Sequence, residues 1–225
     1  MISAVTITAV FSIAFALLRF KGQEKASFVF KFLSSAGFIA IAVTGYLFNS
    51  SNGRYFFWLI MALGFGFLGD IALGLKNIID NYKKYLIASG IIFFLLGHIM
   101  YSVNYITQGG VPWWLFVINI GVAALMMQGT RRLNYKLSFF YIVLGHIYCY
   151  TITMMLISAI SYYFSFQTLA ATLVLIGGIS FFVSDSLLSM SYFKPDAPNT
   201  RVLNLIVHFT YYPAQILLAL SVFFI

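Results

Sequence analysis

The sequence predicts an all-α protein, a polytopic membrane protein that folds as a bundle of eight transmembrane helices. Hydrophobic residues make up 62% of its 225 residues and charged residues only 8%, whereas about a quarter of an ordinary soluble domain is charged. Apolar stretches of about 20 residues recur along the whole chain, and each can cross a hydrocarbon core of about 30 Å as a helix. These observations exclude a soluble globular protein and predict a single transmembrane domain over residues 1–225.

The limits of the spans follow from apolar runs between polar breaks. We expect spans near 2–19, 28–48, 55–75, 85–106, 112–128, 137–160, 166–190 and 201–224. The first has no basic segment before it and is followed by Arg19, Lys21 and Lys25, so it is expected to remain as a span and not to be cleaved as a signal peptide.

The net charge of +8 would suggest a nucleic-acid partner in a soluble protein, but here the basic residues lie in the connections between spans. Of the 13 basic residues, only Arg54 lies in an even-numbered connection. Because short cytoplasmic loops are enriched in Lys and Arg, the odd connections are expected in the cytoplasm and both termini on the non-cytoplasmic side. We expect an integral protein of a bacterial inner membrane, with the lipid bilayer and no nucleic acid as partner.

Two carboxylates, Asp70 and Asp185, fall inside predicted spans. An ionisable side chain there costs a few kcal/mol, which makes it a candidate for function. Each lies about five residues before a predicted cytoplasmic end, hence about 8 Å deep. Gly66 and Gly74 share a helical face with Asp70 and are expected to leave room around it. A purely structural role stays open, in which each Asp caps a broken helix or pairs with a cytoplasmic Lys. The other acidic residues are expected to be solvated in loops: Glu24, Asp80 and Asp196.

Further polar side chains recur at helical spacing inside the spans and are typical of a pocket wall. The eighth span carries a stripe, the fourth a similar face, and the seventh has serines near its aspartate. These candidates are Asn204, His208, Tyr211, Tyr212 and Gln215; His98, Tyr101 and Asn104; and Ser184 and Ser189. A hydrogen-bonded packing role is the alternative for each histidine, because buried polar groups find partners whatever their function.

Four segments in order resemble the YhhN-like lysoplasmalogenase family: GFGFLGD at 64–70, LLGHIMY at 95–101, FFVSDSLLS at 181–189 and TYYPAQILLA at 210–219. The resemblance implies hydrolysis of the vinyl ether bond of a lysoplasmalogen, a lysophospholipid, to a fatty aldehyde and a glycerophospho-base. It also implies that Asp70 and Asp185 are the catalytic pair, with no cofactor and no metal.

Two carboxylates suit this chemistry. One must be protonated to donate a proton to the alkene, and the other must be ionised to stabilise the oxocarbenium ion and orient water. We expect Asp185 to be the acid and Asp70 the anion, because the glycines leave Asp70 more open to water, although the reverse assignment stays open. His208, Tyr212 and Gln215 are expected to hold the water or the glycerol oxygens. The phosphate would meet basic residues at helix ends towards the cytoplasmic leaflet: Lys76, Lys194 and Arg201.

Two other functions are compatible with a polar membrane bundle. A zinc-dependent lipid hydrolase of the ceramidase type would use His98, His146 and His208 as ligands; the spread of their estimated depths argues against one shared ion, but the error in the span edges leaves this alternative open. A small-molecule or proton-coupled transporter would also keep membrane carboxylates.

Overall fold

The computed structural model describes residues 2–194 and 200–225, and the side chains of residues 200 and 201 are not described. Within this part of the chain eight helices are long and apolar enough to cross a membrane. They are α1 (Ile2–Phe20), α2 (Glu24–Phe48), α3 (Gly53–Leu75), α4 (Lys83–Gly109), α5 (Trp113–Arg132), α6 (Phe139–Phe166), α7 (Leu169–Phe193) and α8 (Thr200–Leu220), with short 3-10 turns at Asp80–Tyr82 and Ser221–Phe224.

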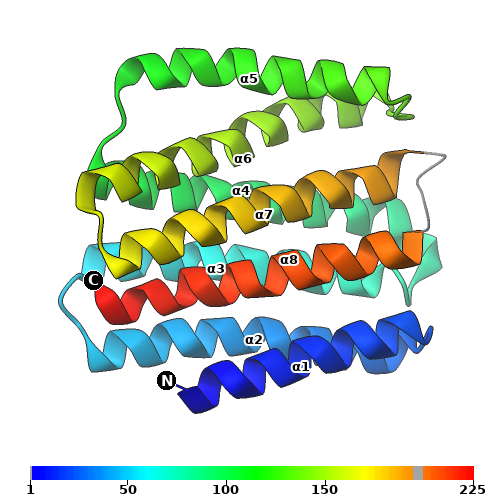
Figure 1. The fold of residues 1–225 in the computed structure, drawn as a ribbon. Coiled ribbons are helices and arrows are strands. Elements are labelled where there is room, and N and C mark those ends of the chain that lie inside the picture. Colours follow the sequence, from blue (N-terminus) through cyan, green and yellow to red (C-terminus); the bar gives the residue numbers. More distant parts are fainter. Residues whose placement is uncertain (1, 195–199) are drawn as a thin grey trace.

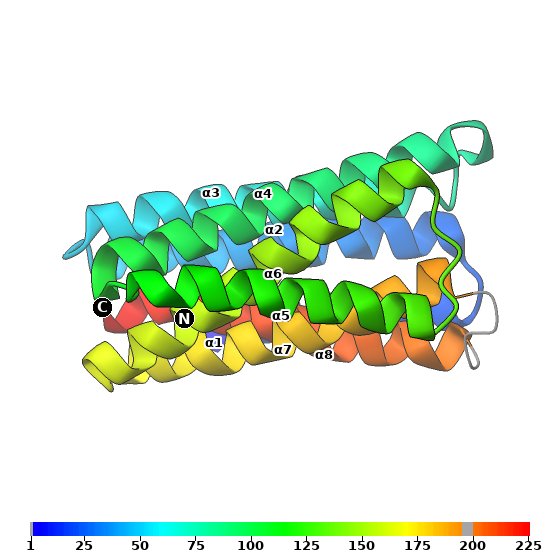
Figure 2. The ribbon, with the colours of Figure 1, turned by 90° about the horizontal axis from the view of Figure 1, so that it is seen from above.

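The helices form two layers, one of α2, α3 and α4 and the other of α1, α8 and α7 (Figures 1 and 2). Helix α6 closes one edge by packing on both α4 and α7, and α5 packs on α6 at the outside of the bundle. The beginning of α1 and the end of the chain lie at the same end of the bundle (Figure 1). The predicted all-α bundle of eight helices is therefore confirmed.

The boundaries differ from expectation where turns are tighter than the apolar runs suggest. Helix α6 continues to Phe166, where the seventh span was expected to begin, and the chain reverses at Gln167 in a left-handed conformation with φ 50°. The Thr168 hydroxyl then accepts a bond from the backbone N–H of Ala171 and caps α7, as Thr does at helix starts. Helix α2 begins at Glu24 and not near residue 28, so Lys25 lies inside it and Lys31 is about two turns from its start.

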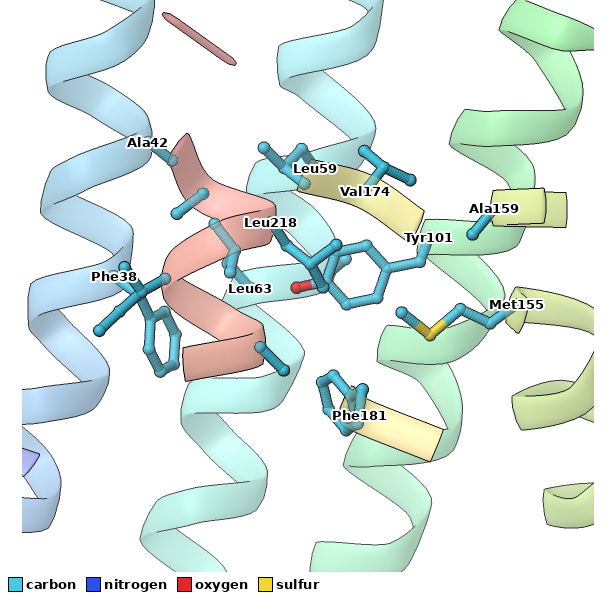
Figure 3. Close-up of a cluster of buried hydrophobic side chains, with 14 of the residues drawn as sticks. Phe38, Ala42, Leu59, Leu63, Tyr101, Met155, Ala159, Val174, Phe181 and Leu218 are labelled. Carbon is cyan, nitrogen blue, oxygen red and sulfur yellow. The ribbon is translucent and has the colours of Figure 1, made fainter. Parts of the chain in front are cut away.

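A buried core runs between the layers, and Figure 3 shows part of it, with side chains from α2, α3, α4, α6, α7 and α8. Phe38, Leu63, Tyr101 and Leu218 are almost inaccessible within it. Many large apolar side chains instead remain exposed on the outer faces of the helices, as expected of surfaces that meet lipid. Small residues bring helices close: a Cβ on Gly97 of α4 would lie 3.2 Å from the carbonyl oxygen of Ala62 in α3, so only glycine fits without displacement.

Candidate active site

A polar cavity lies between the two layers, near the end of the bundle opposite the chain termini. Its cavity volume is about 60 Å³, and it is lined by residues near the ends of α1, α3 and α7, by residues near the beginnings of α2 and α8, and by Phe94 of α4. Asp70 and Asp185 both line it. Helix α3 packs mainly on α4 and helix α7 packs mainly on α8, and α3 and α7 do not pack along one another. The cavity thus brings together two carboxylates from helices that are not neighbours.

Asp70 is held by three donors. Its Oδ1 lies 3.0 Å from Lys31 Nζ, and its Oδ2 accepts hydrogen bonds from the Ser35 hydroxyl at 2.6 Å and the Tyr211 hydroxyl at 2.7 Å. The Asp70 and Lys31 side chains are only 3% and 11% exposed. One basic side chain and two hydroxyl donors thus surround the Asp70 carboxylate. The structural alternative of pairing with a lysine is therefore realised at Asp70.

A chain of hydrogen bonds extends from Asp70 into the core. Tyr211 receives a bond from Gln215 Nε2 at 3.1 Å, and Gln215 Oε1 in turn accepts from the Tyr101 hydroxyl at 2.7 Å. A Cβ on Gly66 would lie 2.8 Å from Gln215 Nε2, and one on Gly74 would collide with the ring of Phe28. The expectation that these glycines leave Asp70 open to water is wrong, since the freed space is filled by neighbouring side chains.

Asp185 has a different environment. Its Oδ2 accepts a short hydrogen bond from the Tyr148 hydroxyl and lies 2.9 Å from His98 Nε2. His98 is fully buried, and its Nδ1 lies 3.2 Å from the sulfur of Met155. Within the described residues, Oδ1 of Asp185 makes no hydrogen bond. Asp185 therefore has one oxygen held by side chains of α4 and α6 and one without a hydrogen-bond partner among the described residues.

Three basic side chains line the cavity, and two of them are paired with carboxylates. Lys31 binds Asp70, and Arg19 forms a close ion pair with Glu24. Lys76, which follows α3, has no carboxylate partner among the described residues, and its Nζ lies 3.5 Å from the centre of the Tyr192 ring. Burial lowers the pKa of Lys76 to about 6, helped by the charges of nearby basic residues: Lys31, Arg19 and Lys83.

Several predicted residues lie at this cavity. It is lined by Asp70, Asp185, Lys76, Ser184, Asn204, His208 and Tyr211. His98 and Gln215 lie behind it and bind Asp185 and Tyr211. Of the polar groups at the wall, Asn204 accepts from Ser191, and the Ser184 hydroxyl donates to the carbonyl of Val207. His208 packs its ring on Phe15, with centroids 4.5 Å apart.

Other predicted residues lie elsewhere. Asn104 donates to the carbonyl of Tyr55 in the core, and Tyr212 packs behind the wall against Phe15. Ser189 and Lys194 do not line the cavity, and the Arg201 side chain, like Asp196, lies outside the described residues. Glu24 was expected to be solvated, but it is half-buried and paired with Arg19 because it opens α2 beside the end of α1.

The predicted equal depth of the two aspartates needs correction. Asp70 lies five residues before the end of α3, but α7 runs to Phe193, which places Asp185 eight residues before its end, or about 12 Å. Counting residues from the end of each helix therefore no longer gives the two aspartates a common depth. The cavity, and not the residue count, brings the two side chains together.

Four residues at the site were missed: Lys31, Ser35, Tyr148 and Arg19. Ser27, Lys31 and Ser35 follow one another at intervals of four in α2, a helical polar stripe that could have identified that face. Tyr148 had no such signal, because the polar side chains of α6 are not gathered on one face. The three histidines of the zinc alternative are not brought together, since His146 is exposed on the outer face of α6 and binds the carbonyl of Ile142. Within the described residues no group of three or more His, Cys, Asp or Glu side chains could hold a metal.

Comparison with known proteins gives one result. The model of the YhhN family matches residues 26–222, which is nearly the whole chain. No curated protein matches significantly, and no solved structure does.

Proposed function

The chain belongs to the YhhN family, and from this premise we propose that it is a lysoplasmalogenase that hydrolyses the vinyl ether bond of 1-alkenyl lysophospholipids. The observation that carries the proposal is one cavity within the membrane spans lined by two carboxylates in unlike surroundings. Two carboxyl groups whose surroundings differ in this way typically act as a protonated acid and an ionised partner.

In the proposed reaction Asp185 donates a proton to the outer alkene carbon of the vinyl ether. Positive charge then develops on the ether carbon and oxygen, and water adds to that carbon while returning a proton to Asp185. The resulting hemiacetal collapses as its hydroxyl proton passes to the glycerol oxygen. The products are a fatty aldehyde and a glycerophospho-base, and the acid is restored.

The contacts of Asp185 favour it as the acid. A thioether sulfur accepts hydrogen bonds but does not donate them, so the contact with Met155 places a hydrogen on His98 Nδ1. In neutral His98 the other ring nitrogen, Nε2, is then an acceptor, and it lies beside Asp185 Oδ2. A proton can therefore rest between Asp185 and His98, and Tyr148 donates to the same carboxylate oxygen in either state.

The contacts of Asp70 favour it as the anion. Lys31, Ser35 and Tyr211 all stabilise the charged form, which can then oppose the developing oxocarbenium charge across the cavity. The predicted assignment of roles is retained, but on these donors and not on exposure to water. His208 and Tyr211 line the cavity and are proposed to contact the attacking water or the glycerol oxygens.

The test is aldehyde release from 1-alkenyl-lysophosphoethanolamine by purified protein in detergent. Asp185→Asn removes the acid and is expected to lower kcat about 10²–10⁴-fold, the usual contribution of a general acid. Asp70→Asn is expected to lower it strongly as well. Asp80→Asn is the matched control, because Asp80 is exposed in the 3-10 turn that precedes α4, and it should keep the wild-type rate. The proposal is wrong if wild-type protein releases no aldehyde, or if Asp70→Asn and Asp185→Asn both keep the wild-type rate.

A further inference from the structure

A second cavity, here called the apolar groove, lies between α4, α6 and α7, with α5 over part of it. Its cavity volume is about 100 Å³, it is partly open to the outside, and nearly all of its wall is apolar. Its lining includes Ile91, Met127, Leu144 and Cys149. The groove therefore offers a long apolar surface that the reaction at the two aspartates does not by itself require.

The groove and the polar cavity are adjacent. Five residues line both of them: Leu73, Phe94, Asp185, Leu188 and Tyr192. Asp185 is the only ionisable carboxylate among the five, so the proposed acid stands at the junction of a polar space and an apolar one. A ligand that spans the junction must itself be polar at one end and apolar at the other.

The charges of the polar cavity specify the polar end. Arg19 and Lys31 are already paired with carboxylates, whereas Lys76 has no carboxylate partner among the described residues and its Nζ lies over the ring of Tyr192. An anion near Lys76 would replace the water that burial has removed and would restore the charge of the amine. Phosphate is the anion that a lysine and a nearby guanidinium bind well.

We propose that the two cavities hold a single-chain phospholipid in one orientation, with its phosphate at Lys76, its hydrocarbon chain in the apolar groove, and the linkage between them at Asp185. This inference rests on the proposed function for the identity of the ligand, and it deepens that function by assigning a subsite to each end. It also predicts binding of lysolipids that the enzyme does not cleave.

The test therefore measures binding and not hydrolysis. The probe is 1-stearoyl-lysophosphatidylethanolamine, an ester without a vinyl ether, compared with glycerophosphoethanolamine, which has no chain, and with monostearoylglycerol, which has no phosphate. Cys149→Phe fills part of the groove, and Val143→Phe is the matched control because Val143 is exposed on the same helix outside the groove.

Cys149→Phe is expected to weaken binding of the stearoyl probe about tenfold, since two methylenes that lose their burial cost about that factor. It should leave glycerophosphoethanolamine unchanged, and Val143→Phe should leave both unchanged. Lys76→Met should weaken both phosphate ligands and spare monostearoylglycerol. Equal effects of the two phenylalanine variants, or equal loss of phosphate and neutral ligands in Lys76→Met, would overturn the orientation.

A second measurement does not depend on folding of the variants. Cys149 is the single cysteine of the chain and is partly exposed, so N-ethylmaleimide labels the wall of the groove in wild-type protein and Cys149→Ser sets the background. The stearoyl probe should slow labelling severalfold and glycerophosphoethanolamine should not. No protection by the stearoyl probe would refute occupancy of the groove, whatever the outcome of the aldehyde assay.

Discussion

The ion pair between Lys31 and Asp70 allows the structural and chemical roles of Asp70 to be separated. The perturbation is a double-mutant cycle of Lys31→Met, Asp70→Asn and the two together. Lys31 Nζ lies 3.0 Å from Asp70 Oδ1, and both side chains are nearly buried. Removing one partner of a buried pair usually costs about 3–5 kcal/mol, because the other charge is left without compensation.

In Lys31→Met the Asp70 carboxylate keeps only the hydroxyls of Ser35 and Tyr211, so we expect the full cost. For a chain of this size the cost corresponds to a fall in Tm of about 6–20 °C. The double variant removes both charges and should regain much of the lost stability, since neutral replacements of similar volume are tolerated. Thermal unfolding in detergent measures all four proteins.

Aldehyde release, measured on the same four proteins, tests the proposed chemical role of Asp70. The double variant is expected to be more stable than Lys31→Met and yet as inactive as Asp70→Asn, because no carboxylate remains to oppose the oxocarbenium charge. Three results would refute the reasoning: Lys31→Met unfolding at the wild-type temperature, a double variant no more stable than either single variant, or a stable double variant with the wild-type rate.

Three further predictions follow from the site. Tyr148→Phe removes one donor to Asp185 and should lower kcat about tenfold with little change in KM, as steady-state aldehyde release will show; a pure rise in KM would contradict this. The pKa of Lys76 is lowered to about 6 and a bound phosphate raises it, so binding of 1-stearoyl-lysophosphatidylethanolamine should be tightest below pH 6 and weaken as the pH rises towards 8. Lys76→Met should abolish that dependence, and a flat wild-type profile would exclude it. Gly66→Ala pushes on Gln215, which would lie 2.8 Å from the new Cβ; we expect a loss of about 1–3 kcal/mol and a weakened Tyr211–Asp70 contact, measured by Tm and by aldehyde release, whereas Gly64→Ala, in open space, should change neither.

The fold could be predicted from the sequence because the bilayer leaves few choices. Lengths of apolar runs give the number of helices, and every helix forms largely within its own segment. Boundaries were less certain where a turn contains apolar or uncharged residues, as between Phe166 and Leu169. Polarity marks such a turn poorly, whereas the left-handed conformation of Gln167 and the cap at Thr168 depend on local geometry.

The candidate site could be predicted only in part. A carboxylate in an apolar span carries a free-energy cost of insertion, which makes it a candidate for function. Asp70 and Asp185 could therefore be identified from the sequence alone. Their partners could not be assigned, because spacing along one helix does not tell which face another helix presents. Lys31 and Tyr148 reach the aspartates from α2 and α6, and only the packing of helices far apart in the sequence shows this.

The position of Asp185 between a polar and an apolar space bears on how products leave. In the proposed reaction, cleavage at that point would divide an amphiphile into two molecules of opposite solubility, each located in the space proposed for it. The glycerophospho-base can depart to water past Lys76, and the aldehyde can pass along α6 and α7 into the lipid without entering water. The two products should therefore inhibit the enzyme to different extents. Long-chain aldehydes should compete with substrate more strongly as their chain length increases, whereas glycerophosphoethanolamine should compete weakly at every concentration tested.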